Sequence, residues 1–146
     1  MIALEKLLLL KTVILFKQMP EDLLLEIINT IVKEKLVPAN LEILNKNSIN
    51  STMYIIVSGR VKVHDGDTLI TELGEREIFG ELSSLTHLPA VSSITTLTEC
   101  LFLTISSSAL YELMDIEPGM SKGIIQALCA RTQSMSQQIR DLLHAK

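Results

Sequence analysis

The apolar residues at both ends of the chain recur every three or four positions, which is the period of a helix. Residues 2–16 are apolar nearly all round. Pro20 is followed by two acidic residues, and this is typical of a helix start because proline and acids both suit the first turn. The pattern predicts a first helix over 2–16 and a second that runs to about Lys33. The apolar stripe of the second helix consists of Leu23, Leu24, Ile27, Ile28 and Ile31.

The middle of the chain changes to short runs that are rich in β-branched or aromatic residues. Asp65-Gly66-Asp67 is a strong signal for a tight hairpin between two of these runs. Short runs at regular spacing are typical of a small antiparallel barrel or jelly roll. The runs predicted as strands are 53–57, 61–64, 69–73 and 100–104.

The helical period returns after Ser106. It predicts a short helix to about Met114 and, beyond Pro118, a long helix that reaches toward Leu143. We therefore expect an α+β fold that is mainly β, an antiparallel barrel or jelly roll flanked by N-terminal helices and two C-terminal helices. The expected single domain, residues 1–146, divides into helices at 1–33, a barrel at 35–105 and helices at 106–146.

Composition and charge narrow the class of protein. The 146 residues are 47% hydrophobic and carry a net charge of -4, with no basic run, which argues against nucleic-acid binding. The apolar stretch 7–16 is interrupted by Lys11 and is shorter than the roughly 20 residues that cross a bilayer, so we expect no direct membrane insertion. Cys100 and Cys129 lie in apolar surroundings, and we interpret both as reduced core residues of a cytoplasmic protein.

The segment 79–93 carries the most informative chemistry. Its Gly80-Glu81-Leu82 turn opens a short helix, and a helix start presents unpaired backbone N–H groups to an anion. Such a cradle usually also recruits an arginine. Here Ala90 stands just after Pro89, where that arginine is expected.

Several motifs occur in the order found in one family. Leu15-Phe16 precede Pro20-Glu21-Asp22-Leu23, then comes the run 54–63, and then 79–82. With the order of elements, these motifs make the chain resemble the cyclic-nucleotide-binding domain, the regulatory module of cAMP-dependent kinases, nucleotide-gated channels and catabolite-activator-type regulators. Asn40 and Asn47 stand where the family usually has glycine. Because asparagine tolerates left-handed backbone, we expect these turns to survive.

The resemblance implies a cradle for the cyclic phosphate and the ribose. In the family the glutamate hydrogen-bonds the ribose 2′-hydroxyl, and the arginine that Ala90 replaces holds the phosphate. Losing one partner of a buried charge pair costs about 2–5 kcal/mol. His87 and Arg131 are the nearest candidate cations, and we interpret both as solvated. The residues carried over by position are Gly80, Glu81, Leu82, Ser83, Ser92 and Ser93.

Two functions stay open. One is a regulatory or interaction module whose phosphate site is degenerate, with Glu81 kept only as a cap for backbone donors. The other is a sensor for a cyclic nucleotide or small anion that moves the last helix. We expect no enzyme and no metal site, because no nucleophile, base and acid are arranged for catalysis and the three histidines are scattered. No cofactor is expected beyond weak binding of cAMP, cGMP or another anion.

The last helix offers a partner surface. Its apolar positions approach a coiled-coil seam, which favours a homodimer, although packing of the first half on the barrel explains them equally well. The apolar first helix is a second contact surface, for another copy or a neighbouring domain. Its sequence resembles the lead-in to nucleotide-binding modules of bacterial ATP/ADP-translocase-like transporters, which implies attachment to a membrane protein in a longer chain. The seam consists of Ile124, Leu128, Met135, Ile139 and Leu142.

Overall fold

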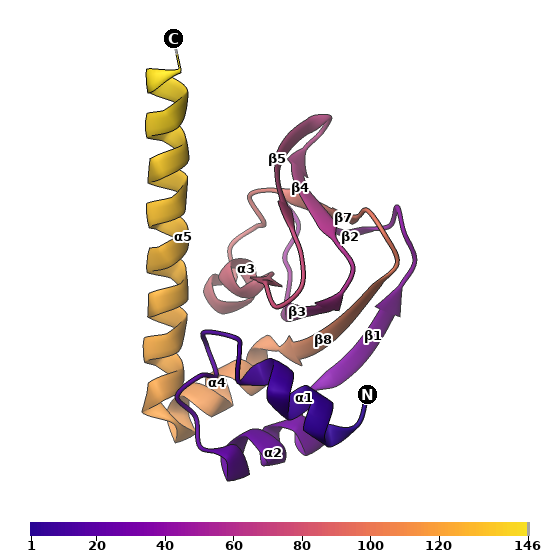
Figure 1. The fold of residues 1–146 in the computed structure, drawn as a ribbon, viewed down its shortest axis with the longest axis vertical. Coiled ribbons are helices and arrows are strands. Elements are labelled where there is room, and N and C mark those ends of the chain that lie inside the picture. The colour runs from indigo at the N-terminus through magenta and orange to yellow at the C-terminus, as the bar shows by residue number, and fades with distance from the viewer. Residues whose placement is uncertain (146) are drawn as a thin grey trace.

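Two four-stranded antiparallel sheets form the centre of the computed structural model, which describes residues 1–145 (Figure 1). One sheet has the order β1-β8-β3-β6 and the other β2-β7-β4-β5. This arrangement confirms the predicted mainly β jelly-roll fold with flanking helices. The strands are β1 (Lys33–Val37), β2 (Glu42–Leu44), β3 (Thr52–Ser58), β4 (Val61–Asp65), β5 (Thr68–Leu73), β6 (Ile78–Phe79), β7 (Ser93–Thr96) and β8 (Cys100–Ser106).

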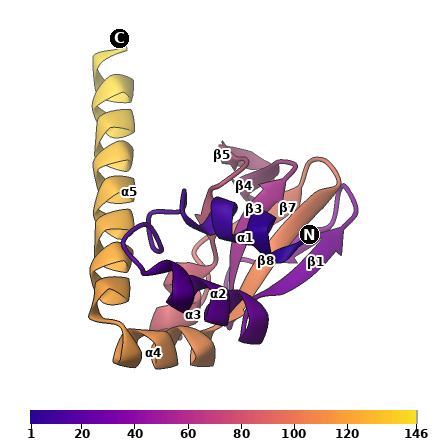
Figure 2. The ribbon, with the colours of Figure 1, turned by 60° about the horizontal axis from the view of Figure 1, so that its bottom comes forward.

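Five helices surround the strands in the described part of the chain. In Figure 1, α1, α2 and α4 lie together at the base of the barrel, whereas α5 rises along its side. Figure 2 shows the same separation of α5 from a second direction. The helices are α1 (Ala3–Leu10), α2 (Glu21–Thr30), α3 (Glu81–Thr86), α4 (Ser107–Ile116) and α5 (Pro118–His144).

The N-terminal region differs from the expectation in its boundaries. The first helix ends at Leu10 rather than residue 16. Residues 11–19 form turns in which several N–H groups bond three residues back, as from Phe16 to the Val13 carbonyl. The second helix ends at Thr30, because Lys33 already pairs with Thr104 of β8. Helix-like spacing does not distinguish a long helix from turns that bury the same apolar residues.

Two apolar cores follow from this arrangement. The first lies where the helices meet the barrel, and includes Phe16, Ile27 and Leu110 together with Ile55 and Leu103 of the sheet. The second fills the barrel and is centred on three aromatic rings. The Tyr54 and Phe79 rings stack at 4.8 Å between centroids, and Phe102 meets each edge-on at 5.5 Å. Aromatic pairs of this geometry add stability beyond the area that they bury.

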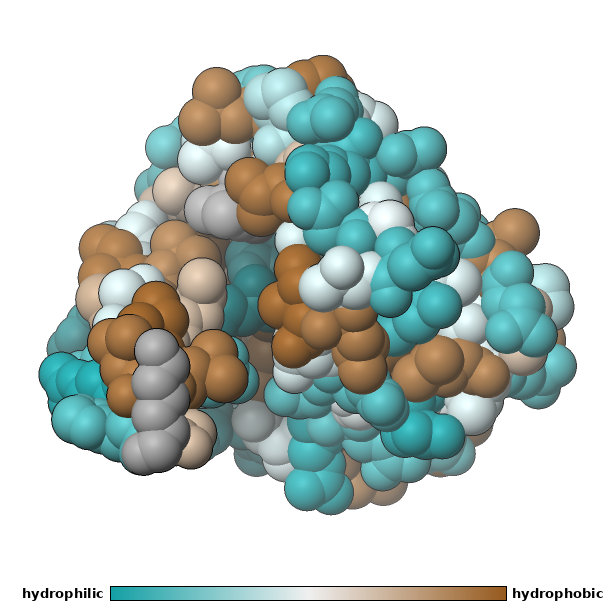
Figure 3. All heavy atoms as spheres, turned by 90° about the horizontal axis from the view of Figure 1, so that it is seen from above, coloured by the Kyte–Doolittle hydropathy of each residue, from teal (hydrophilic) through white to brown (hydrophobic). Residues whose placement is uncertain are grey.

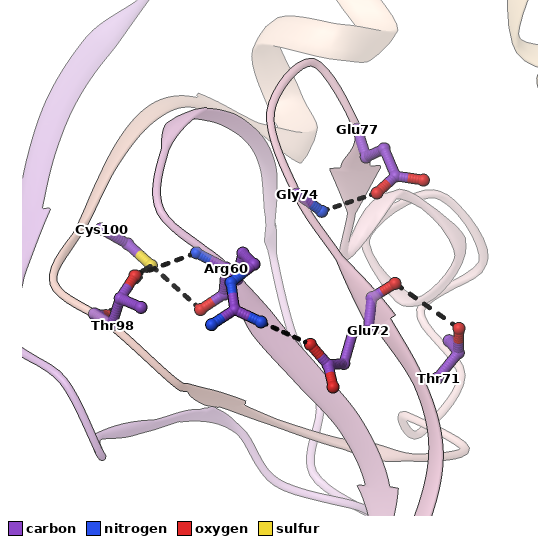
Figure 4. A network of polar contacts seen from close by, with 7 residues as sticks. All are labelled: Arg60, Thr71, Glu72, Gly74, Glu77, Thr98 and Cys100. Atoms are coloured by element: carbon purple, nitrogen blue, oxygen red, sulfur yellow. Dashed lines mark hydrogen bonds and ion pairs between the residues drawn. The ribbon is translucent and has the colours of Figure 1, made fainter.

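A polar network lies around Arg60, just before β4 (Figure 4). The Arg60 backbone N–H donates to Thr98 Oγ1 at 3.1 Å, and the Arg60 guanidinium pairs with Glu72 at 2.9 Å. The Cys100 thiol donates to the Arg60 carbonyl at 3.4 Å, and burial raises the pKa of this thiol. The network joins β4 to β5 and β8, so Cys100 is the structural core residue that the sequence predicts.

The first half of α5 is packed and the second half is not. A Cβ atom on Gly123 would lie 2.9 Å from the Leu15 carbonyl oxygen, so glycine is needed for this close approach. Met120 and Ile124 are buried beside it. Beyond Arg131 the described residues of α5 are exposed, and Cys129 is exposed too. The prediction that Cys129 is a core residue was therefore wrong, because it lies on the outer face of a helix that is only partly covered.

Candidate functional site

The turn between β6 and α3 requires glycine at position 80. Gly80 has a φ of 81°, in the left-handed region, and a Cβ atom there would lie 2.6 Å from the Thr52 carbonyl oxygen. The Asn50 amide donates to the Thr52 carbonyl at 2.6 Å and to the Gly80 carbonyl at 3.0 Å. Asn50, which lies just before β3, thus fixes the turn at Gly80, and α3 begins at the next residue.

Glu81, the first residue of α3, forms an ion pair across the molecule. Its Oε1 accepts a hydrogen bond from the Arg131 guanidinium of α5, and a second nitrogen of that guanidinium donates to the Ile78 carbonyl. The Glu81 side chain is 2% exposed, whereas that of Arg131 is 41% exposed. The interpretation of Arg131 as a solvated charge was wrong, because α5 passes close enough to α3 for the guanidinium to span both acceptors.

Burial dominates the electrostatics of Glu81. Removal from water raises the pKa of this carboxyl above its ordinary value, and the positive charge of Arg131 opposes the shift without cancelling it. A hydrogen bond from the Glu81 backbone N–H to its own carboxyl also opposes the rise of this pKa. When it is ionised, this carboxylate only accepts hydrogen bonds, so any further group that binds it must be a hydrogen-bond donor.

Two polar atoms at this site lack a hydrogen-bond partner among the described residues. They are Glu81 Oε2 and Ser83 Oγ, and both are buried. A buried polar group without a partner costs about 1–3 kcal/mol. The first turn of α3 therefore has two buried side-chain oxygens that are still able to form hydrogen bonds.

Ala90, where the resemblance described above leads us to expect an arginine, lies in apolar surroundings. It is 5% exposed and belongs to the same core as Tyr54 and Phe79. Its N–H donates to the Ser48 carbonyl at 2.8 Å, and its carbonyl accepts from the Asn47 N–H at 2.8 Å. Both backbone groups are thus used to join two loops, and the methyl side chain offers no charge.

The remaining residues predicted for the cradle differ in position. Ser93 is buried, and its hydroxyl accepts from the Lys46 N–H at 2.9 Å, so it ties β7 to the neighbouring loop. Ser92 is half-buried just before β7. His87 stacks on Tyr111 of α4 at 6.0 Å between ring centroids. Leu82 lies in α3, and its side chain is outside the part that the structure describes.

Asn40 and Asn47 adopt left-handed backbone, with φ values of 63° and 72°, as expected for positions that resemble glycine turns. Asparagine tolerates this region better than most residues. His64, beside the predicted hairpin, contacts the Gly66 carbonyl and Thr95 Oγ1 at 2.8 Å each, so both ring nitrogens have protein partners.

Metal-binding clusters and membrane-spanning helices are both absent from residues 1–145. No group of three or more His, Cys, Asp or Glu side chains is placed to hold a metal ion. Of the helices described, none combines the length and the apolar character needed to cross a membrane.

The predicted seam of α5 is divided between the two halves of the helix. Ile124 is buried and Leu128 is half-buried, so the N-terminal part of the seam packs on the helical core. Met135, Ile139 and Leu142 are 61%, 57% and 74% exposed. Viewed from above, apolar side chains gather on the upper end of α5 and across the hollow that separates it from the barrel (Figure 3).

These features coincide with those of one family. The sequence model of the cyclic nucleotide-binding domain family matches residues 34–117. The chain therefore belongs to this family. It is 32% identical over 139 residues to potassium channel AKT2 of Oryza sativa subsp. japonica, covering 91% of this chain and 16% of the channel. It is 33% identical over 96 residues to the CRP-like cAMP-activated global transcriptional regulator of Mycobacterium tuberculosis, covering 62% of this chain and 43% of the regulator.

The fold agrees with solved structures of the same class. A cyclic nucleotide-binding domain from Methylobacillus flagellatus superimposes with a TM-score of 0.78 at 20% identity, covering 94% of this chain and 82% of that one. The chain spans less than half the length of the curated relatives described above. The part shared with these relatives includes the cyclic nucleotide-binding domain.

Proposed function

We propose that the chain is a non-catalytic regulatory or interaction module whose phosphate site is degenerate, so that it does not bind cAMP or cGMP tightly. The supporting observation is Ala90, which places a buried methyl group where the family has its arginine. A cyclic phosphate brought to this site meets the Glu81 carboxylate and no guanidinium at position 90. The loss of about 2–5 kcal/mol for an unpaired buried charge weakens a micromolar site to tens of micromolar or beyond.

Calorimetric titration with cAMP and cGMP tests this proposal. The native chain is expected to bind neither nucleotide more tightly than tens of micromolar. Ala90→Arg is expected to gain about tenfold or more, because it supplies the missing cation. Ala130→Arg is the matched control, since it adds the same charge to an exposed position of α5 and is expected to change nothing. Submicromolar binding by the native chain contradicts the proposal, whatever the variant does.

A second function, a ligand sensor that moves α5, is favoured by one observation. The Glu81–Arg131 pair connects the first residue of α3 directly to α5. A ligand that binds differently with this pair made and broken shifts the position of α5. In this function, ligand binding changes the position of the exposed second half of α5, and a partner that contacts this half detects the change.

The partner that fits α5 best is a second copy of the same helix. Leu128, Met135, Ile139 and Leu142 are separated by seven, four and three residues, which fits a coiled-coil heptad. The hollow beside it is lined by Leu142 and Gln138 of α5 and by Ile70 of the β4–β5 hairpin. Neither Ser136 nor Gln138, which flank the seam, carries a charge, so two copies in parallel meet without repulsion there.

A further inference from the structure

A hollow between α5 and the β4–β5 hairpin lies apart from the start of α3 (Figure 3). Its α5 residues begin seven positions beyond Arg131, which is about two helical turns or roughly 10 Å along the axis. The hollow has a volume of about 470 Å³, within the range of about 300–1,000 Å³ that small-molecule sites occupy. It is lined by Ile70, Gln138, Asp141, Leu142 and Ala145.

A β-bulge directs one apolar side chain of the hairpin to this hollow. Val63 of β4 pairs with Thr71, and the next residue, His64, pairs with Leu69. Ile70 is therefore an extra residue of β5, which is an edge strand of its sheet. Bulges at sheet edges re-aim side chains, often next to binding sites. Ile70 accordingly lines the hollow and is 51% exposed, whereas the equally exposed Leu69 is not one of the lining residues.

Side-chain contacts hold this hairpin in place. His64 contacts the Gly66 carbonyl and Thr95 Oγ1 at 2.8 Å each, and Lys46 pairs with Asp65 at 2.8 Å. These contacts join the hairpin to β7 and to the loop that follows β2. The hairpin wall of the hollow is thus formed before any ligand binds, which lowers the entropic cost of binding.

The charge of the hollow is negative. Asp141 supplies a carboxylate, and one of its oxygens accepts a hydrogen bond from the Gln137 amide at 2.9 Å. Among the described residues that line the hollow, none is basic. Arg140, the nearest arginine in the sequence, lines a different hollow of α5 together with Thr132 and Ser136. A positively charged group that enters the hollow is therefore attracted by Asp141.

We propose that this hollow binds a small organic amine with an apolar body and one ammonium group. The apolar body contacts Ile70 and Leu142, and the ammonium group donates to the second carboxylate oxygen of Asp141. Gln137 acts as a positioning residue, because its hydrogen bond to the first oxygen orients the carboxylate. The amine site goes beyond the proposed function and does not depend on it, since it shares no residue with the start of α3.

Titration with n-octylammonium, n-octanol and n-octanoate, followed by NMR of the backbone amides, tests the proposal on the native chain. The three probes share an apolar chain of similar length and differ in the charge of the head group. The amine is expected to bind about fivefold more tightly than octanoate, because an exposed ion pair makes a modest contribution. This preference is expected to shrink as salt is added. The largest chemical-shift changes are expected around Ile70 and Asp141.

Matched variants separate the site from general effects. Asp141→Asn is expected to bring the amine to the affinity of octanol, and Asp115→Asn, at an exposed position of α4, is expected to leave the preference for the amine unchanged. Ile70→Ala is expected to weaken all three probes about threefold, because it removes apolar contact. Leu69→Ala, the neighbouring exposed residue outside the lining, is expected to change none of them. Circular dichroism checks that each variant remains folded.

Several outcomes overturn the amine site, and none of them bears on the cAMP and cGMP titrations that test the proposed function. Equal binding of the amine and octanoate, or no binding of any probe at millimolar concentration, would remove the basis for a charged ligand. A preference for the amine that persists in Asp141→Asn would place the cation elsewhere. Amine binding that disappears at concentrations where the chain dimerises would show that a second copy fills the hollow.

Discussion

The Arg131 guanidinium of α5 donates to Glu81 Oε1 at the first residue of α3, joining two residues that are 50 positions apart in the sequence. The same guanidinium bonds the Ile78 carbonyl of β6. These two contacts tie α5, beyond its buried anchor, to the start of α3 and to β6. The position of a long and otherwise exposed helix is therefore coupled to the chemistry of one buried carboxylate.

Removing the guanidinium is expected to destabilise the fold. Arg131→Met leaves a buried carboxylate without its cation, and the expected loss in the free energy of unfolding is about 1–3 kcal/mol, measured by urea denaturation. In a double-mutant cycle, Glu81→Leu combined with Arg131→Met is expected to recover part of this loss. Arg140→Met, at an exposed position of the same helix, is the control and is expected to stay within about 0.5 kcal/mol of the native chain. Additive effects in the cycle would show that the pair contributes nothing.

The raised pKa of Glu81 predicts a specific dependence of stability on pH. As the pH rises, the unfolded chain ionises this carboxyl near its ordinary pKa of about 4.5, before the folded chain does. The contribution of Glu81 is therefore fully present below that pH and is lost as the pH rises through the raised folded pKa. Glu81→Gln does not titrate, so the native chain is expected to lose stability relative to this variant over that interval. Parallel stability curves for the two proteins would contradict the raised pKa.

The close approach at Gly123 predicts that a single methyl group moves α5. Gly123→Ala places its Cβ 2.9 Å from the Leu15 carbonyl oxygen, and the expected loss is about 1–3 kcal/mol as the helix shifts. Gly119→Ala is the matched control, because its nearest neighbour is the flexible end of Glu117 at 3.4 Å. Alanine stabilises a helix relative to glycine by about 0.5–1 kcal/mol, so this control is expected to gain stability. Thermal unfolding of both variants distinguishes crowding from helix propensity.

The exposed seam of α5 predicts self-association. Ile139→Lys places a charge in the seam, and sedimentation velocity over a range of concentrations is expected to show the native chain shifting to a dimer while this variant stays a monomer. Gln133→Lys adds the same charge to an exposed position outside the seam and is expected to dimerise like the native chain. A native chain that is monomeric at all concentrations would exclude dimerisation through α5.

The extent of sequence-based prediction differs between the barrel and the site. The strands 53–57, 61–64, 69–73 and 100–104 coincide with β3, β4, β5 and β8, because runs rich in β-branched and aromatic residues between turn residues specify strands locally. β1, β2, β6 and β7 were not predicted. β1 has four exposed residues of five, and β6 has only two residues, so neither carries an apolar period. These strands form because longer neighbours offer them hydrogen-bond partners.

The sequence by itself determined the family, the order of the elements, the glycine at position 80 and the alanine at position 90. Each depends on residue type at one position or on a local period. Only the tertiary structure decided that Arg131 meets Glu81, that Glu81 Oε2 and Ser83 Oγ are buried without partners, and that Cys129 is exposed. These facts depend on where α5 crosses the barrel, and that crossing is set by the packing of Gly123 against Leu15 rather than by any local pattern.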